Sequence, residues 1–139
     1  MSAQMDNSKQ PKSSKTTKTR SRVNRDESPQ HLRGKLRLCQ IFRDHQFRAE
    51  CEKRFPCFVE LGEMRCRYQV DVYATRAARR IIVEVDGWQG HKTTQAFIKD
   101  QLRIRRIKEE YGQDIEVYRF TLRRLSKWSD EEIAQEMGL

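Results

Sequence analysis

Two short runs decide how this chain folds: Val70-Asp71-Val72-Tyr73-Ala74 and Arg80-Ile81-Ile82-Val83-Glu84-Val85-Asp86-Gly87. Both are rich in β-branched and aromatic residues, and they flank a short break at 75–78, a pattern typical of a β-hairpin. Side chains alternate between the two faces of a strand. Glu84 and Asp86 therefore leave the same face at the end of an otherwise apolar strand.

Asp71 adds a third carboxylate on the neighbouring strand. It lies between two valines, so it points away from its apolar neighbours. Hard divalent cations such as Mg²⁺, with Mn²⁺ as the second choice, bind oxygen ligands in a partly open shell. The sequence therefore predicts a metal site at Asp71, Glu84 and Asp86. The alternative is that these acids are solvent-facing positions of a half-covered antiparallel sheet.

The length of 139 residues predicts one domain, and the composition predicts its partner. A formal net charge of +9 favours a polyanion, most commonly nucleic acid. We see no apolar segment long enough to span a bilayer and no leader-like apolar run, and we expect an intracellular, DNA-associated protein. Residues 1–29 are polar and basic, which predicts a disordered tail before a domain at 30–139.

The cysteines, Cys39, Cys51, Cys57 and Cys66, show no CxxC spacing. Their intervals fit no common zinc pattern. Reduced and mostly buried thiols are therefore expected. A closed zinc site with four sulfur ligands is the alternative.

Hydrophobic periodicity predicts an α/β chain with a mixed α+β sheet. A helix is expected from His31 to about Arg54 because apolar residues recur at three- and four-residue steps, and Pro56 would end it. The 44–46 region could break this helix into two. The remaining expected elements are strands at Cys57–Leu61, Met64–Ala74 and Arg80–Asp86, a helix at Thr94–Tyr111 after an N-cap at 93–94, a strand at Ile115–Phe120, a basic connector at Leu122–Leu125, and a helix opening at Ser129.

Asp100 lies inside the predicted core-facing stripe of the helix at 94–111. The stripe contains Phe97, Ile104, Ile107 and Tyr111. Burying a lone carboxylate is costly unless it is paired or near a cation, so Asp100 is a candidate site residue. A salt bridge to Arg103 is the alternative.

The opposite face of the same helix is basic, with Lys99, Arg105, Arg106 and Lys108. Such a face can follow the phosphates of a nucleic acid. It is also what an ordinary solvated helix looks like.

The order of these elements resembles the restriction-endonuclease-like nuclease superfamily, whose core is α-β-β-β-α-β. Its motif is an Asp followed by a strand bearing Glu-x-Lys. Asp71 and Glu84 match, whereas Asp86 stands where the Lys is expected. With His91 and Asp100, the chain is similar to the branch related to the very-short-patch mismatch-repair endonuclease, summarised as E-D-x-H-D. The resemblance covers roughly residues 55–125.

The resemblance implies a role for each matching residue. Asp71 would be the principal metal-binding carboxylate, and Glu84 and Asp86 would supply further oxygens. His91 would activate or orient the attacking water, or assist at the leaving oxygen, because an imidazole transfers protons near neutral pH. Asp100 would hold His91 in position or complete the site.

Three further assignments concern the substrate and the first helix. Lys92 would stabilise the charge that develops on the phosphate. Lys99, Arg103 and Arg106, with Lys92, are the expected nucleic-acid contacts. The leading Glu of the branch is expected on the first helix, with Glu52 preferred and Glu50 as the alternative.

Together these observations predict a Mg²⁺-dependent DNA endonuclease. A nucleic-acid-binding module without catalysis is the rival, and the exchange of Lys for Asp86 favours it. RNA is the alternative substrate. Because no separate recognition domain is visible, specificity would come from loops, the tail, a second copy of the chain or a partner protein.

Overall fold

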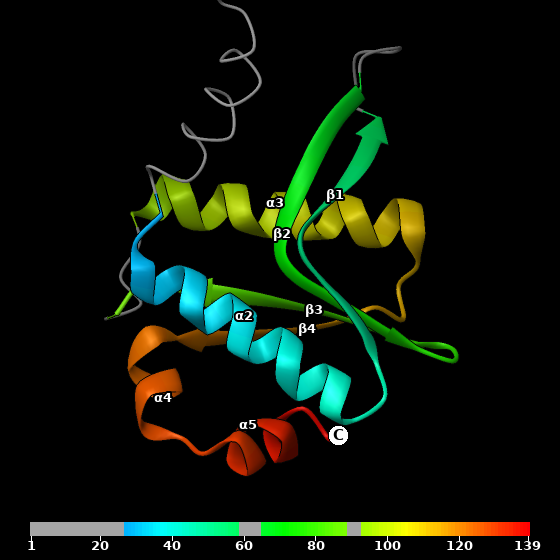
Figure 1. The fold of residues 1–139 in the computed structure, drawn as a ribbon. Helices are drawn as coiled ribbons and strands as arrows, with labels where there is room; N and C mark the ends of the chain where they lie inside the picture. Colours follow the sequence, from blue (N-terminus) through cyan, green and yellow to red (C-terminus); the bar gives the residue numbers. More distant parts are fainter. Residues whose placement is uncertain (1–26, 59–64, 89–92) are drawn as a thin grey trace, which may run out of the picture.

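A four-stranded mixed sheet between helices forms the fold, as the computed structural model shows for residues 27–58, 65–88 and 93–139 (Figure 1). The predicted tail lies outside these ranges except for residues 27–29. His91 and Lys92 also lie outside them. In order, the elements are α2 (Pro29–Asp44), β1 (Arg48–Phe58), β2 (Arg65–Arg76), β3 (Arg79–Asp86), α3 (Thr94–Tyr111), β4 (Glu116–Thr121), α4 (Leu122–Lys127) and α5 (Asp130–Glu136).

The strands follow the order β1-β2-β3-β4 across the sheet. The first three are antiparallel neighbours, whereas β4 returns through α3 to pair in parallel with β3. The expected hairpin is present, with its turn at 77–78. The α/β class, the mixed sheet and the α-β-β-β-α-β order are therefore confirmed.

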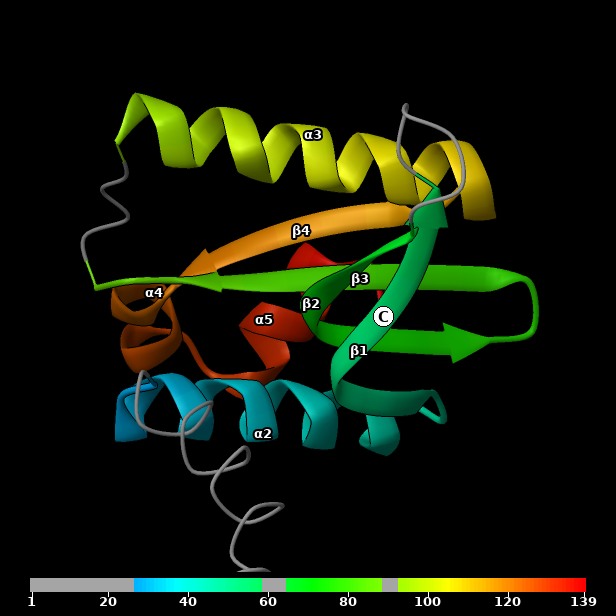
Figure 2. The same cartoon turned by 90° about the horizontal axis from the view of Figure 1, so that it is seen from above.

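Helices cover both faces of the sheet (Figure 2). One core cluster lies on the α2 side, where Leu38 and Phe42 pack with Val83 and Phe120. A smaller cluster lies on the α3 side, where Ile107 packs with Ile82. The strand β3 contributes to both clusters because its alternate side chains enter opposite layers. Within the described ranges, no helix is both long and apolar enough to cross a bilayer.

The prediction of one helix from His31 to about Arg54 is wrong in its second half. The helix α2 ends at Asp44, and Gln46 adopts a left-handed φ of 70° that turns the chain into β1. Phe47 then packs against Phe42, with ring centroids 5.4 Å apart. Pro56, the expected helix stop, lies inside β1, where it is tolerated because β1 is an edge strand. The strand expected at 57–61 therefore begins at Arg48.

The basic connector expected at 122–125 is also wrong, because these residues begin α4. Thr121 caps this helix, and the guanidinium of Arg124 stacks on the rings of Phe120 and Trp128. The final helix is confirmed, with a capping box between Ser129 and Glu132.

The helix α3 has the predicted bounds, with Thr93 as its N-cap and Gly112 at its end. Its predicted apolar stripe is only partly correct. Ile107 is buried and Ile104 packs beside it, but Phe97 is 54% exposed and Tyr111 is 38% exposed. Tyr111 nevertheless packs edge-on against the buried ring of Phe55, with ring centroids 5.1 Å apart.

Candidate active site

Asp71 and Glu84 are joined where β2 and β3 separate. Counted from the hairpin turn, the last paired residues are Val72 and Val83. Asp71 and Glu84 are the next residues on each strand. Beyond that point side chains replace the ladder: the Asp71 N–H donates to Glu84 Oε2 at 3.0 Å, and the Val85 N–H donates to Asp71 Oδ2 at 2.7 Å. These two bonds hold both carboxylates where β2 leaves β3.

Glu84 is the more deeply buried of the two acids, with 5% of its surface exposed. Burial raises the pKa of its carboxyl above the ordinary 4.5, and the negative charge of Asp71 adds to the effect. Arg103 opposes this rise through an ion pair with Glu84 Oε1. The ionised form of Glu84 is therefore destabilised, and a cation bound beside it would stabilise it.

Asp86 and Asp100 join the same network through arginines. Arg119 on β4 forms a two-pronged pair with Asp86, at 3.1 and 2.9 Å, and its Nη2 also contacts Asp100 Oδ2 at 3.0 Å. Arg103 lies 3.3 Å from Asp100 Oδ1, which is the salt bridge that the sequence left open. The structure therefore links all four predicted acids. Asp71 and Glu84 are connected by hydrogen bonds from backbone N–H groups, whereas Asp86 and Asp100 are connected through guanidinium groups.

The network concentrates negative charge in a basic protein. Its four carboxylates face two guanidiniums, Arg103 and Arg119, which leaves an excess equal to the charge of one divalent cation. Among the described residues, no three His, Cys, Asp or Glu side chains already surround one point as metal ligands. The donor chemistry of Asp71 and Glu84 nevertheless fits an oxygen-preferring cation.

His31, which the sequence does not mark as a site residue, approaches the site from the first turn of α2. Its Nε2–H donates to the Val85 carbonyl at 2.7 Å, and the same nitrogen lies 3.9 Å from Asp71 Oδ2. Its Nδ1 lies 3.8 Å from Glu27 Oε2. A histidine in a predicted helix carries no signal of this contact, because the helix must first be docked on the sheet.

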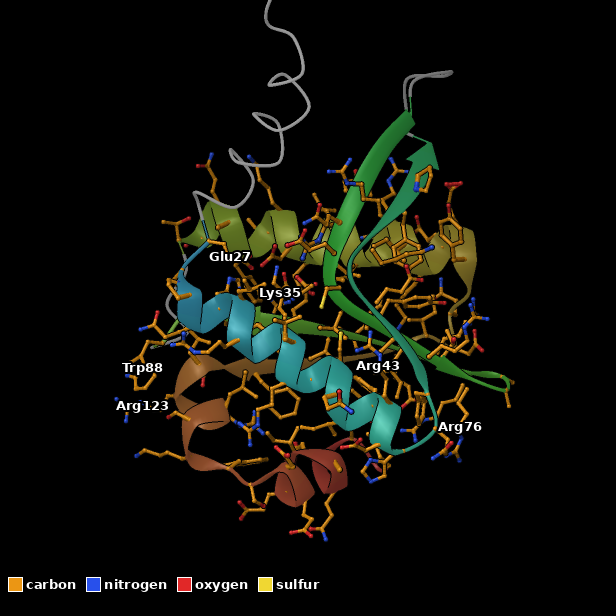
Figure 3. All side chains as sticks on the ribbon, in the orientation of Figure 1. Glu27, Lys35, Arg43, Arg76, Trp88 and Arg123 are labelled. Carbon is orange, nitrogen blue, oxygen red and sulfur yellow. The ribbon has the colours of Figure 1, made fainter. Side chains whose placement is uncertain are left out.

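Lys35, one turn further along α2, is a second residue that the sequence did not single out. It is 2% exposed, and its ammonium contacts Glu27 and lies 2.7 Å from Glu52 Oε2. Figure 3 shows Glu27 just before α2 and Lys35 within it. Burial alone would lower the pKa of Lys35, but its hydrogen bonds to the two carboxylates outweigh burial and raise it.

The predicted position of Glu52 on the first helix is wrong, because Glu52 lies on β1. Its φ of 58° is left-handed, and its pairing neighbours Cys51↔Val72 and Lys53↔Val70 place it opposite Asp71. It therefore reaches the neighbourhood of the site from a strand. The alternative, Glu50, is exposed and lies 3.8 Å from Lys53.

The predicted nucleic-acid contacts occupy different environments. Lys99 is exposed and Arg106 is half-buried on α3, whereas Arg103 points into the acidic network. The Nε of Arg103 is buried and has no hydrogen-bond partner within the described part of the chain. Lys92 and His91 lie outside the described residues.

A groove of about 510 Å³ lies elsewhere, between α2, α4 and Trp88. Leu36, Leu122 and Leu125 contribute to its walls, and none of the four acids lines it. A large groove is the usual first candidate for a binding site. The carboxylates that could bind a cation, Asp71 and Glu84, lie outside this groove and form the candidate cation site.

The Arg119 fork makes a prediction about stability. Replacing Arg119 by Ala leaves Asp86 and Asp100 without their shared cation, so we expect the free energy of unfolding to fall by about 2 kcal/mol. Arg119→Lys should recover less than half of the loss, because an ammonium cannot reproduce the fork. Urea denaturation measures both variants. Equal stability of Arg119→Ala and the parent would contradict a structural role for the fork.

Comparisons with known proteins do not assign a family. No protein-family model matches the chain, and no curated protein matches it. A similar solved structure is the crystal structure of AF1548, a protein of unknown function, with 12% sequence identity and a TM-score of 0.44. The match covers 76% of this chain and 53% of that one, so this chain spans about half of its length.

Proposed function

We propose that this chain is a metal-dependent endonuclease that hydrolyses phosphodiester bonds in DNA. The observation that carries the proposal is a pair of hydrogen bonds at this point of the sheet, from Asp71 N–H to Glu84 and from Val85 N–H to Asp71. The α-β-β-β-α-β order supports it, since it is that of the restriction-endonuclease-like superfamily. The net charge of +9 supports a nucleic-acid substrate.

Asp71 and Glu84 would hold the cation, Mg²⁺ or Mn²⁺, and Asp86 would supply a further oxygen directly or through water. The bound cation supplies Lewis-acid polarisation of the phosphate and acidifies water. The hydrogen bonds from Val85 N–H and Asp71 N–H orient the two carboxylates before any ligand arrives. This orientation reduces the reorganisation that the reaction would otherwise need.

The remaining roles are assigned to residues around the pair. His91 would accept the proton of the attacking water, and Asp100 and Lys92 would assist as the resemblance implies. Arg103, whose buried Nε lacks a partner among the described residues, offers a donor that a phosphate oxygen would satisfy. Lys99 and Arg106 would contact flanking phosphates. A second copy or a partner protein would add specificity.

The second candidate is a DNA-binding module without catalysis. The observation that favours it is that both Asp86 oxygens accept hydrogen bonds from Arg119, at the position where the superfamily has a lysine. An Asp held in this way cannot replace a lysine in activating water. The same phosphate contacts would then serve binding alone.

The experiment that separates the two candidates is plasmid cleavage. Supercoiled DNA is incubated with the full chain and Mg²⁺ or Mn²⁺, in parallel with excess EDTA and with the Glu84→Gln protein purified identically. We expect nicked or linear product that EDTA and Glu84→Gln both remove. Product that persists in the Glu84→Gln sample would indicate a contaminant, and DNA binding without product from any sample would favour the module. Competition with RNA tests the substrate class.

A further inference from the structure

Two cysteines from different elements meet on the α2 side of the sheet. Cys39 Sγ on α2 lies 3.1 Å from Cys51 Sγ on β1, and both thiols are reduced. Cys39 is fully buried and Cys51 is half-buried. Because a disulfide has its sulfurs about 2 Å apart, an approach of about 1 Å would join them. This pairing of two thiols belongs to no part of the proposed hydrolytic site.

The charges around the pair make its two members unequal. A hydrogen bond from Cys39 lowers the pKa of the Cys51 thiol to about 7, and Lys35 and Arg43 act in the same direction. Burial and Glu52 oppose the change. The same hydrogen bond and burial raise the pKa of Cys39. Figure 3 labels Lys35 and Arg43, which lie on α2 on either side of Cys39 in the sequence. Near neutral pH, Cys51 is therefore the nucleophile and Cys39 remains a thiol.

We propose that Cys39 and Cys51 form an oxidation site that takes a small peroxide and closes to a reversible disulfide between α2 and β1. The Cys51 thiolate attacks one peroxide oxygen, the O–O bond breaks, and the leaving oxygen takes up a proton. Cys39 Sγ then attacks the Cys51 sulfur, the S–O bond breaks, and hydroxide leaves as water with the Cys39 proton. The two thiols together give two electrons to the peroxide.

The disulfide would join elements that also frame the candidate active site. Cys51 pairs with Val72, the neighbour of Asp71, and it precedes Glu52, the partner of Lys35. The bridge would close a short loop across the α2–β1 connection. Restricting that loop in the unfolded chain should raise Tm by about 5 °C or more.

The test uses the reduced full chain and hydrogen peroxide, followed by alkylation in denaturant and peptide mapping without reductant. We expect loss of two alkylatable thiols, a Cys39–Cys51 linked peptide, recovery of both thiols with dithiothreitol, and a rate that rises with pH through about 7. Cys51→Ser should abolish the linked peptide, whereas Cys57→Ala, a buried cysteine outside the pair, should retain it.

Mapping of the unsubstituted chain decides the outcome even if a variant folds poorly. A linked peptide from another pair of cysteines, or Cys51 sulfinic acid with Cys39 still alkylatable, would overturn the proposal. A fall in Tm after bridge formation would overturn the claim that the folded state accommodates the bond. DNA cleavage is not a readout here, so failure of the nuclease proposal leaves this test intact.

Discussion

The Asp71→Asn protein should lose DNA cleavage by a factor on the order of 100 or more, because a metal held by Asp71 contributes several kcal/mol to the transition state. The amide oxygen of Asn can still accept the 2.7 Å hydrogen bond from Val85 N–H. The substitution therefore removes the charge and retains the local geometry. Initial rates of plasmid nicking in Mg²⁺ and Mn²⁺ measure the loss, and fluorescence anisotropy with labelled DNA in EDTA measures binding, which should be retained.

Asp44→Asn is the matched control for Asp71→Asn. Asp44 lies at the end of α2, and its carboxylate accepts a hydrogen bond from Gln40 at 2.9 Å. Because this acid is exposed and is not part of the candidate site, the cleavage rate of Asp44→Asn should equal that of the parent. Asp71→Ala should be as inactive as Asp71→Asn but less stable, because it also removes the acceptor of Val85 N–H. Parent-like cutting by Asp71→Asn would remove Asp71 from the mechanism.

Lys35→Ala should produce the second large effect, on stability. The substitution removes the cation between Glu27 and Glu52 at a position that is 2% exposed, and leaves two partly buried carboxylates uncompensated. Breaking such a buried arrangement costs about 3 kcal/mol. Because the pKa of Lys35 is raised above its usual 10.5, the lysine is charged and this contribution is fully present below pH 10.5. Urea denaturation at pH 7 measures the loss.

Lys53→Ala is the control for Lys35→Ala. Lys53 also faces a glutamate, Glu50 at 3.8 Å, but 36% of its side chain is exposed, so its loss should cost less than about 1 kcal/mol. Adding Glu27→Gln and Glu52→Gln to Lys35→Ala should restore part of the stability, since the uncompensated charges are then gone. Equal losses for Lys35→Ala and Lys53→Ala would contradict the interpretation of Lys35 as a buried bridge.

Local sequence predicted the parts of the fold that local physics determines. The alternation in β3 and the Gly-ended, Thr-capped α3 are readable because each depends on neighbours within a few residues. The 31–54 segment was wrongly predicted to be one helix because β1 carries apolar residues at spacings that also suit a helix. The left-handed backbone of Gln46, which separates α2 from β1, has no such periodic signal.

The candidate site was predictable only in part, for a related reason. Acids on neighbouring strands can be expected to meet, as Asp71 and Glu84 do. The residues that contact this region come from distant elements: Arg119 from β4 pairs with the acids, and His31 from α2 lies beside Asp71. Whether an arginine neutralises an acid or faces solvent depends on docking, which no single stretch of sequence contains.

The parallel return of β4 beside β3 determines when this acidic network can exist during folding. Glu84 and Asp86 belong to the strand before the crossover, Asp100 and Arg103 to the crossover helix, and Arg119 to the strand after it. An early hairpin of β2 and β3 would hold its carboxylates without their guanidinium partners, and their mutual repulsion would oppose compaction. Docking of α3 brings Arg103 to Glu84 and Asp100, and pairing of β4 then brings Arg119 to Asp86 and Asp100. The complete network therefore exists only after the last strand has joined the sheet.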